Sequence, residues 1–145
     1  MENNLKALPM LSFGKAVSIC LNKKYTTFKG RARRSEYWYF VLFQSIVLVI
    51  ATILDNIVGL TFEYSFYGWL YLLCGLALLL PALGVGFRRL HDVGHSGWWI
   101  LISLIPFVGA IGLLVFWCSD SQMGPNKYGE SPKYVTDDTE ITQTI

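Results

Sequence analysis

Three long stretches without a charged residue constrain the fold of this chain more than any other feature of its sequence. They cover residues 37–54, 65–87 and 96–119. A helix of about 20 residues crosses a hydrocarbon core roughly 30 Å thick, and each stretch reaches the ~18 residues that mark a candidate span. Backbone groups in lipid must be paired within their own segment, so such stretches form helices. The sequence therefore predicts an all-α membrane protein that crosses a bilayer several times.

The composition excludes a separate soluble domain. Charged residues make up 15% of the chain, whereas soluble domains carry about 25%, so too few charges are present to cover a water-facing surface. We divide the chain into a basic leader, a membrane domain with three transmembrane helices, and a polar, partly disordered tail, at residues 1–36, 37–119 and 120–145. We expect the three spans at about 37–60, 65–87 and 97–118. Aromatic residues cluster at the span ends, where amphipathic rings favour the headgroup level.

The distribution of basic residues predicts the orientation of the spans. Eight of the twelve lysines and arginines precede Glu36, two lie at positions 88 and 89, and two lie in the tail. With three spans, the leader and the second connection share a side, which gives ten basic residues against two. Because basic loops stay in the cytoplasm, we expect a cytoplasmic N-terminus and a periplasmic C-terminus. The alternative is that Pro106 and Gly109 fold the third stretch into a re-entrant hairpin, which returns the tail to the inside.

The leader has apolar residues near helical spacing, with polar residues between them. The apolar positions are Met10, Phe13, Val17, Cys20, Leu21 and Phe28. This pattern predicts an interfacial amphipathic helix on the anionic cytoplasmic leaflet, with lysines that reach lipid headgroups. The alternative is a loosely ordered basic arm.

Two charged clusters are expected at the membrane surface. The first consists of Arg31, Arg33, Arg34 and Glu36, directly before the first span. A polybasic segment in this position anchors the topology and contacts lipid phosphate. The second cluster follows the second span.

In the second cluster, Arg88 or Arg89 can pair with Asp92 at helical spacing. His91, Asp92 and His95 have side chains that suit transition metals. The two histidines share a helix face only if Gly94 is helical, however, and a third strong ligand is missing nearby. We therefore predict no metal and no cofactor. Instead, Glu36, His91 and Asp92 are expected to form a structural charge cluster with the arginines.

No motif for nucleophilic catalysis, metalloprotease chemistry or phosphate-cradling glycine loops occurs in the sequence. The three cysteines stand singly in apolar surroundings, which indicates neither disulfides nor a zinc site. Asp55 is a lone acid near the end of the first span, and we interpret it as the solvated start of a loop. Intramembrane acids are functional candidates by default, which leaves an ion site as the alternative.

Three ordered motifs carry a resemblance to a known family. They are the run Gly30-Arg-Ala-Arg-Arg-Ser-Glu-Tyr-Trp38, the loop Arg88-Arg-Leu-His-Asp92 with the following Gly94, Ser96, Gly97, Trp98 and Trp99, and the late Gly124-x-Asn126-x-Tyr128-Gly129 with Pro132. Over roughly 13–133, the chain resembles the YhaH/YhaI-like family of small bacterial inner-membrane proteins (domain of unknown function, number 805). The resemblance implies a bacterial inner-membrane location and no established activity. The position of His95 is often arginine in that family, which further weakens a metal role.

The leading functional hypothesis is a non-enzymatic membrane module. In it, both arginine clusters meet at the cytoplasmic surface and bind anionic lipid headgroups or a partner protein through Arg31, Arg33, Arg34, Arg88 and Arg89. Small residues along the second span would allow a homo-oligomer, and nothing indicates nucleic acid. The alternative is a small channel or transporter subunit that uses Asp55 or the arginine loop. A weaker alternative is a membrane enzyme that acts on phosphate-bearing lipid through His91 and Asp92.

Overall fold

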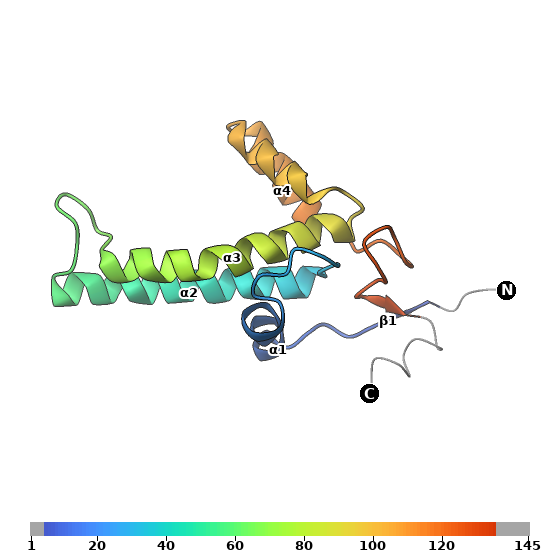
Figure 1. The fold of residues 1–145 in the computed structure, drawn as a ribbon, viewed down its shortest axis with the longest axis horizontal. Coiled ribbons are helices and arrows are strands. Elements are labelled where there is room, and N and C mark those ends of the chain that lie inside the picture. Colours follow the sequence, from blue (N-terminus) through green and yellow to red (C-terminus); the bar gives the residue numbers. More distant parts are fainter. Residues whose placement is uncertain (1–4, 136–145) are drawn as a thin grey trace.

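Two long antiparallel helices form the body of the protein in a computed structural model, which describes residues 5–135. Helix α2 (Arg34–Val58) and helix α3 (Trp69–Asp92) lie side by side over most of their length (Figure 1). Each contains an 18-residue window with a mean hydropathy of 2.2, so each is long and apolar enough to cross a membrane. These helices coincide with the first two expected spans to within a few residues. The expected disorder of the tail concerns mostly residues 136–145, which lie outside the described residues.

Asp55 joins the two helices at their connected ends. Its two carboxylate oxygens accept hydrogen bonds from the backbone N–H groups of Leu70 and Tyr71, at 3.0 and 2.8 Å. The first N–H groups of a helix have no partner within the helix and favour a negative charge, so Asp55 caps α3 from the neighbouring helix. A side chain at Gly68 would overlap Asp55. The interpretation of Asp55 as a solvated loop start is wrong, because the residue is fully buried.

Pro81 interrupts the hydrogen bonds inside α3. Proline has no N–H group, so the carbonyl oxygen four residues earlier, at Ala77, loses its helical partner. The hydroxyl group of Tyr25, which follows the helical part of the leader, donates to this oxygen. Pro81 is fully buried at this site. The leader therefore satisfies a backbone group that the sequence of α3 leaves open.

The third apolar stretch forms a helical hairpin. A 3-10 helix η2 (Gly97–Leu104) is followed by a turn at Pro106 and then by helix α4 (Val108–Cys118), which packs back against it. At about 2.0 Å per residue for η2 and 1.5 Å for α4, both arms are roughly 16 Å long, about half of a hydrocarbon core. The prediction of one continuous span over 97–118 is corrected by this geometry, which agrees with the hairpin alternative.

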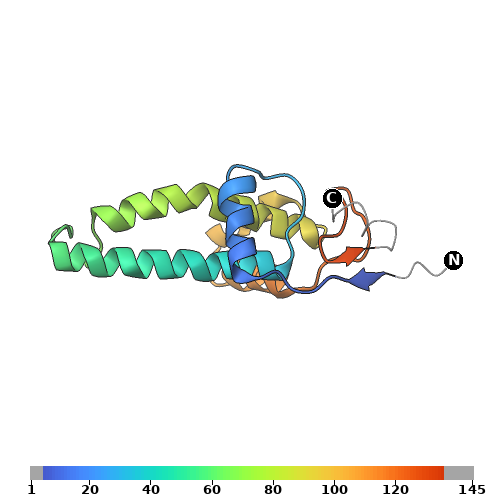
Figure 2. The same cartoon turned by 90° about the horizontal axis from the view of Figure 1, so that it is seen from below.

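The helical part of the leader crosses the α2–α3 pair. It consists of helix α1 (Phe13–Ser18) and a π-helical turn η1 (Ile19–Lys23), and Figure 2 shows it running across both long helices. Ala16 and Cys20 are buried, whereas Met10 and Phe13 are exposed. The predicted amphipathic helix is therefore present in shortened form, and its place at a membrane interface stays a prediction.

The leader and the tail meet in a short antiparallel sheet. Strand β1 (Lys6–Ala7) pairs with strand β2 (Tyr134–Val135), and the N–H group of Leu8 donates to the carbonyl oxygen of Lys133 at 2.7 Å. This sheet is an addition to the predicted all-α fold. The predicted orientation places leader and tail on opposite sides of a membrane, whereas the two segments are hydrogen-bonded to each other here. The hairpin of η2 and α4 returns the chain to this end.

Candidate functional site

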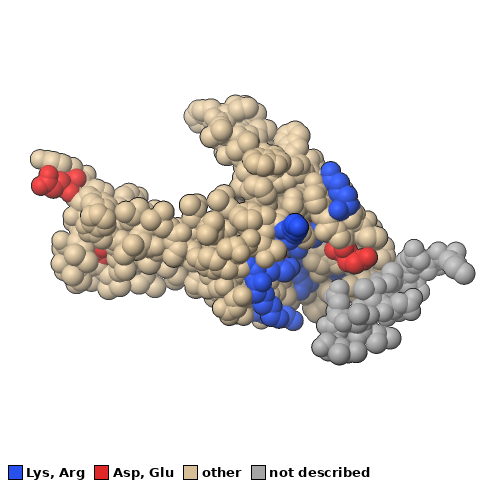
Figure 3. Space-filling model, in the orientation of Figure 1, with Lys and Arg blue, Asp and Glu red and all other residues tan. Residues whose placement is uncertain are grey.

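Five charged residues are buried together at the end of the molecule where leader and tail meet. We call Arg31, Glu36, Arg88, Arg89 and Asp92 the arginine network; each is at most 4% exposed. The antiparallel α2–α3 pair places the first turn of α2, with Glu36, beside the last turn of α3. Figure 3 shows lysines and arginines over this end, while the long arm of the molecule carries none on the face shown. The network therefore closes the polar end of an otherwise apolar body.

Glu36 and Arg88 form an ion pair between α2 and α3. Arg88 donates from Nη1 to Oε1 of Glu36, and its Nε donates to the carbonyl oxygen of Gly84 at 3.3 Å. The thiol of Cys20 lies 3.9 Å from Oε1 of Glu36 and 3.8 Å from Nη2 of Arg88. Burial and the nearby carboxylate of Glu36 raise the pKa of Cys20 to about 11, so the thiol stays protonated at neutral pH.

Asp92 connects α3 with the leader and the tail. Its Oδ1 accepts from Nε of Arg31 at 2.9 Å, and its Oδ2 accepts from Nη1 of Arg89 and from the hydroxyl of Ser121, each at 2.6 Å. Because buried charges are tolerated only when they are paired and hydrogen-bonded, this arrangement explains how a carboxylate and two guanidinium groups share a dry site. The predicted pairing within the second cluster occurs between Arg89 and Asp92.

The side chain of Arg31 binds backbone carbonyl groups of the tail. Besides the bond to Asp92, its Nη1 donates to the carbonyl oxygen of Gly124 at 2.7 Å, and its Nη2 donates to that of Gln122 at 2.7 Å. A longer bond reaches the carbonyl oxygen of Gly129 at 3.3 Å. The fixed fork of the guanidinium group suits several acceptors at once. Arg31 therefore holds the tail loop against the end of α3.

Arginines also cap the C-terminal end of α4. Arg89 donates to the carbonyl oxygens of Trp117, at 3.2 Å, and Ser119, while Arg34 donates to that of Cys118 at 3.3 Å. The last carbonyl groups of a helix have no helical partner and carry partial negative charge. These contacts fix the point at which the hairpin rejoins the network.

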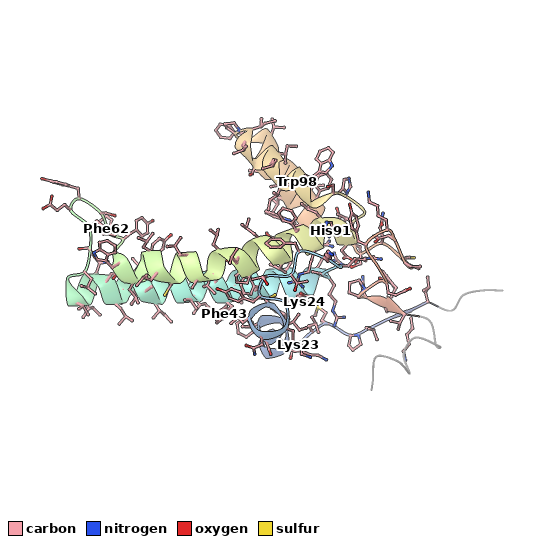
Figure 4. All side chains as sticks on the ribbon, viewed as in Figure 1. Lys23, Lys24, Phe43, Phe62, His91 and Trp98 are labelled. Carbon is pink, nitrogen blue, oxygen red and sulfur yellow. The ribbon has the colours of Figure 1, made fainter. Side chains whose placement is uncertain are left out.

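His91 packs against the tail. Its ring stacks on that of Tyr128 with centroids 3.8 Å apart, and its Nδ1 lies 3.1 Å from the carbonyl oxygen of Gly30. Figure 4 shows His91 where the end of α3 meets the tail. His95 instead packs against the rings of Trp99 and Phe116. Within residues 5–135, no group of three or more His, Cys, Asp or Glu side chains is placed to hold a metal ion.

A second, exposed ion-pair group joins the tail to the start of α2. The carboxylate of Asp120 accepts from Nζ of Lys133 at 2.6 and 2.7 Å and from the hydroxyl of Tyr134 at 3.0 Å, and it lies 3.2 Å from Arg34. Burial is the largest single cause and raises the pKa of Asp120, but the hydrogen bonds and the nearby arginine together outweigh it and lower the pKa to about 2. Asp120 is therefore ionised throughout the physiological range.

The five arginines proposed as a headgroup pocket have divided roles. The structure brings both clusters together, but Arg31, Arg88 and Arg89 are buried with their donors directed at protein acceptors. Arg33 is half-buried and Arg34 is exposed. The network can thus hold leader, helices and tail together, whereas ligand contact is left to residues at its edge.

Sequence reasoning missed the contribution of the tail to this site. Ser121 and the carbonyl groups of residues 122–129 are acceptors and donors for the network, yet none of them has a charge that marks it. The sequence signal that could have revealed this contribution is the motif of Gly124, Asn126, Tyr128 and Gly129. In it, Asn126 donates to the carbonyl oxygen of His91 at 3.0 Å, and the glycines at 124 and 129 have positive φ angles.

Comparison with known proteins finds a family match over most of the chain. Residues 25–130, which include the whole arginine network, match the family model described as a protein of unknown function, DUF805. The chain is 46% identical over 112 residues to the inner membrane protein YhaI of Escherichia coli (strain K12), which covers 77% of this chain and 91% of YhaI. It is 41% identical over 111 residues to the inner membrane protein YhaH of the same strain, with the same coverage. No solved structure matches the chain.

Proposed function

Because the chain belongs to the DUF805 family, we propose that it is an inner-membrane protein whose helices α2 and α3 cross the bilayer as a hairpin. The relatives YhaI and YhaH are named inner membrane proteins, and both helices have the length and hydropathy of spans. Its proposed function is to bind anionic lipid headgroups through the basic leader, without catalysis.

The charge distribution supports a cytoplasmic leader and a cytoplasmic tail. With two spans, the connection over residues 59–68 is the only loop on the far side, and it contains no lysine or arginine. All twelve basic residues then fall on one side, compared with ten against two in the three-span arrangement. Basic loops are retained in the cytoplasm. The hairpin of η2 and α4 would enter the cytoplasmic leaflet, with the exposed side chains of Leu104 and Phe107 at its tip.

The observation that carries the lipid-binding proposal is the leader itself. Its helical part crosses the α2–α3 pair (Figure 2) and so runs along the plane of the bilayer that the pair would span. Exposed lysines at positions 15, 23 and 29 accompany the exposed apolar side chains of Met10 and Phe13. Such a segment gains apolar burial and about 1 kcal/mol per basic residue from anionic lipid.

The test is native mass spectrometry of the protein released from nanodiscs. In discs that contain phosphatidylglycerol, the wild-type protein should retain anionic lipid, and in phosphatidylcholine discs it should emerge without lipid. Replacement of Lys15, Lys23, Lys24 and Lys29 with glutamine should abolish the retention, because the leader loses four charges. A control replaces Lys127 alone, an exposed lysine in the tail, and should retain lipid. Equal retention by the quadruple variant would contradict the proposed function.

The rival functions receive less support from the geometry. An ion pathway through Asp55 would need a carboxylate open to solvent, and this one caps α3 in a fully buried position. Catalysis by His91 and Asp92 would need their side chains to face a substrate, and they pack against Tyr128 and the two arginines instead. The homo-oligomer stays a prediction.

A further inference from the structure

We propose that a hollow between the leader and the tail binds one phosphate group of an anionic lipid. This inference rests on the proposed function and gives it a defined site. The hollow measures about 470 Å³ and lies between residues 8–33 of the leader, Glu36 at the start of α2 and residues 128–132 of the tail. Ligand pockets commonly measure about 300–1,000 Å³, so the hollow can admit a lipid headgroup.

The charge of the wall favours an anion. Lys15, Lys24 and Arg33 line the hollow, and neither lysine has an acidic partner among residues 5–135. Glu36 also lines it, but its charge is compensated by Arg88, just as that of Arg31 is compensated by Asp92. Two unpaired lysines and Arg33, which interacts electrostatically with Glu36, therefore face one exposed acid, Glu130.

Arg33 is held in position for a phosphate group. Its Nη1 donates to the carbonyl oxygen of Pro9 at 2.7 Å, which fixes the guanidinium plane against the leader. Its Nε and Nη2 donate to no acceptor within residues 5–135. A guanidinium edge with two free N–H groups matches two oxygens of one phosphate, while lysines supply point charges beside it. The wall thus combines the two kinds of cation that phosphate sites use.

The surroundings identify a lipid as the source of the phosphate. Apolar side chains of Leu8, Leu11 and Ile19 line the same hollow, and Met10 and Phe13, which lie between them in the sequence, are exposed. A soluble phosphate ester would gain nothing from these apolar groups, whereas a lipid can place its glycerol and upper acyl chain along them. The site would therefore lie where the leader meets the headgroup layer.

The test divides the four leader lysines into two pairs. One variant carries Lys15→Gln and Lys24→Gln, which remove both lysines of the hollow. The matched control carries Lys23→Gln and Lys29→Gln, which remove the same charge from exposed positions outside the hollow; Lys23 and Lys24 are both shown in Figure 4. Each protein is released from phosphatidylglycerol nanodiscs into detergent, and bound lipid is counted by native mass spectrometry. Circular dichroism and melting temperature verify that both variants are folded.

The wild-type protein should retain one phosphatidylglycerol per chain. The pair within the hollow should reduce this occupancy by about tenfold more than the control pair does, because both pairs lose general attraction to anionic lipid but only the former cations contact the phosphate directly. Equal losses in both pairs would overturn the defined site and leave the proposed function intact, since general attraction would then account for binding. Retention by both pairs and by the quadruple variant would overturn both. Glycerol phosphate that displaces the lipid at equal concentration would overturn the lipid as the source.

Discussion

The carboxylate of Asp92 holds three parts of the chain with two oxygen atoms. It binds Arg31 of the leader, Arg89 of its own helix and Ser121 of the tail. Its side chain is fully buried, so water cannot replace a partner that is removed. In such a network each member is strongly stabilising only while the others are present.

Asp92→Asn should destabilise the protein by about 3–5 kcal/mol, because two buried guanidinium groups lose their counter-charge. The matched control is Asp120→Asn, which makes the same chemical change in an ion-pair group whose carboxylate is 44% exposed and should cost about 0–1 kcal/mol. The free energy of unfolding is measured by titration with sodium dodecyl sulfate in mixed micelles. Similar losses for both variants would mean that water reaches the arginine network.

Tyr25→Phe should destabilise the protein by about 1 kcal/mol, because the carbonyl oxygen of Ala77 then has no donor. The same measurement in a Pro81→Ala background separates this cause from lost packing. Alanine at position 81 supplies the missing backbone N–H to Ala77, so the cost of Tyr25→Phe should shrink there. An unchanged cost in that background would show that the hydroxyl group acts elsewhere.

At the scale of single residues, the sequence predicts ion pairs within one helix better than ion pairs between distant segments. The spacing of Arg89 and Asp92 predicts their contact, because both residues lie on one turn. The contact between Arg31 and Asp92 joins positions 61 apart, and the sequence offered only the general expectation that two charged clusters meet. Burial of the arginines was not expected, since a charge pattern does not reveal which acceptors the tail supplies.

The hairpin of η2 and α4 is the element that most changes the architecture from its expected form. Its two arms pack so closely that a side chain at Gly109 would overlap the backbone carbonyl of Ile102. Hydropathy alone could not reveal this, because a continuous span and a hairpin of two short helices have the same apolar composition. Pro106 and Gly109 were the residues that indicated a hairpin. The prediction of a continuous span rested on the length of the apolar stretch.

Gly109→Ala should therefore open the hairpin, whereas Gly112→Ala should leave it closed. The Cβ atom at position 112 would lie 3.8 Å from Cδ1 of Ile102, an ordinary contact, and alanine favours a helix by about 0.5–1 kcal/mol over glycine. The readouts are the melting temperature in detergent for both variants and, for Gly109→Ala, a disulfide cross-link between cysteines placed at Ile102 and Gly112. If Gly109→Ala preserves both values, the close packing of the arms is wrong.

At the scale of the whole molecule, both chain ends belong to one polar end. The pairing of β1 with β2, the capping of α4 by Arg34, and the contacts of Arg31 each connect the leader with residues after 117. The sequence predicted the side of the leader from its charge, and this orientation stays a prediction. The side of the tail also stays a prediction, and it depends on the number of spans, which the hairpin changes.

A fluorescent protein fused after Tyr134 should be bright, and alkaline phosphatase fused at the same point should be inactive, because both would remain in the cytoplasm. The internal control places the same reporters in the connection between α2 and α3, after Glu63, where the opposite pair of results is expected. Active phosphatase at the tail would contradict the shared side of leader and tail.

The contacts between Arg31 and the tail also set an order of events during synthesis. They join residues 91 to 98 positions apart. At about 5–20 residues per second, Arg31 is made several seconds before its carbonyl partners. Until the ribosome has translated residue 122, both long helices and Asp92 are complete while the buried guanidinium group of Arg31 still lacks its carbonyl acceptors in the tail. A nascent chain that stalls before Ser121 would carry an open, charged end, which gives membrane proteases a physical mark for unfinished copies.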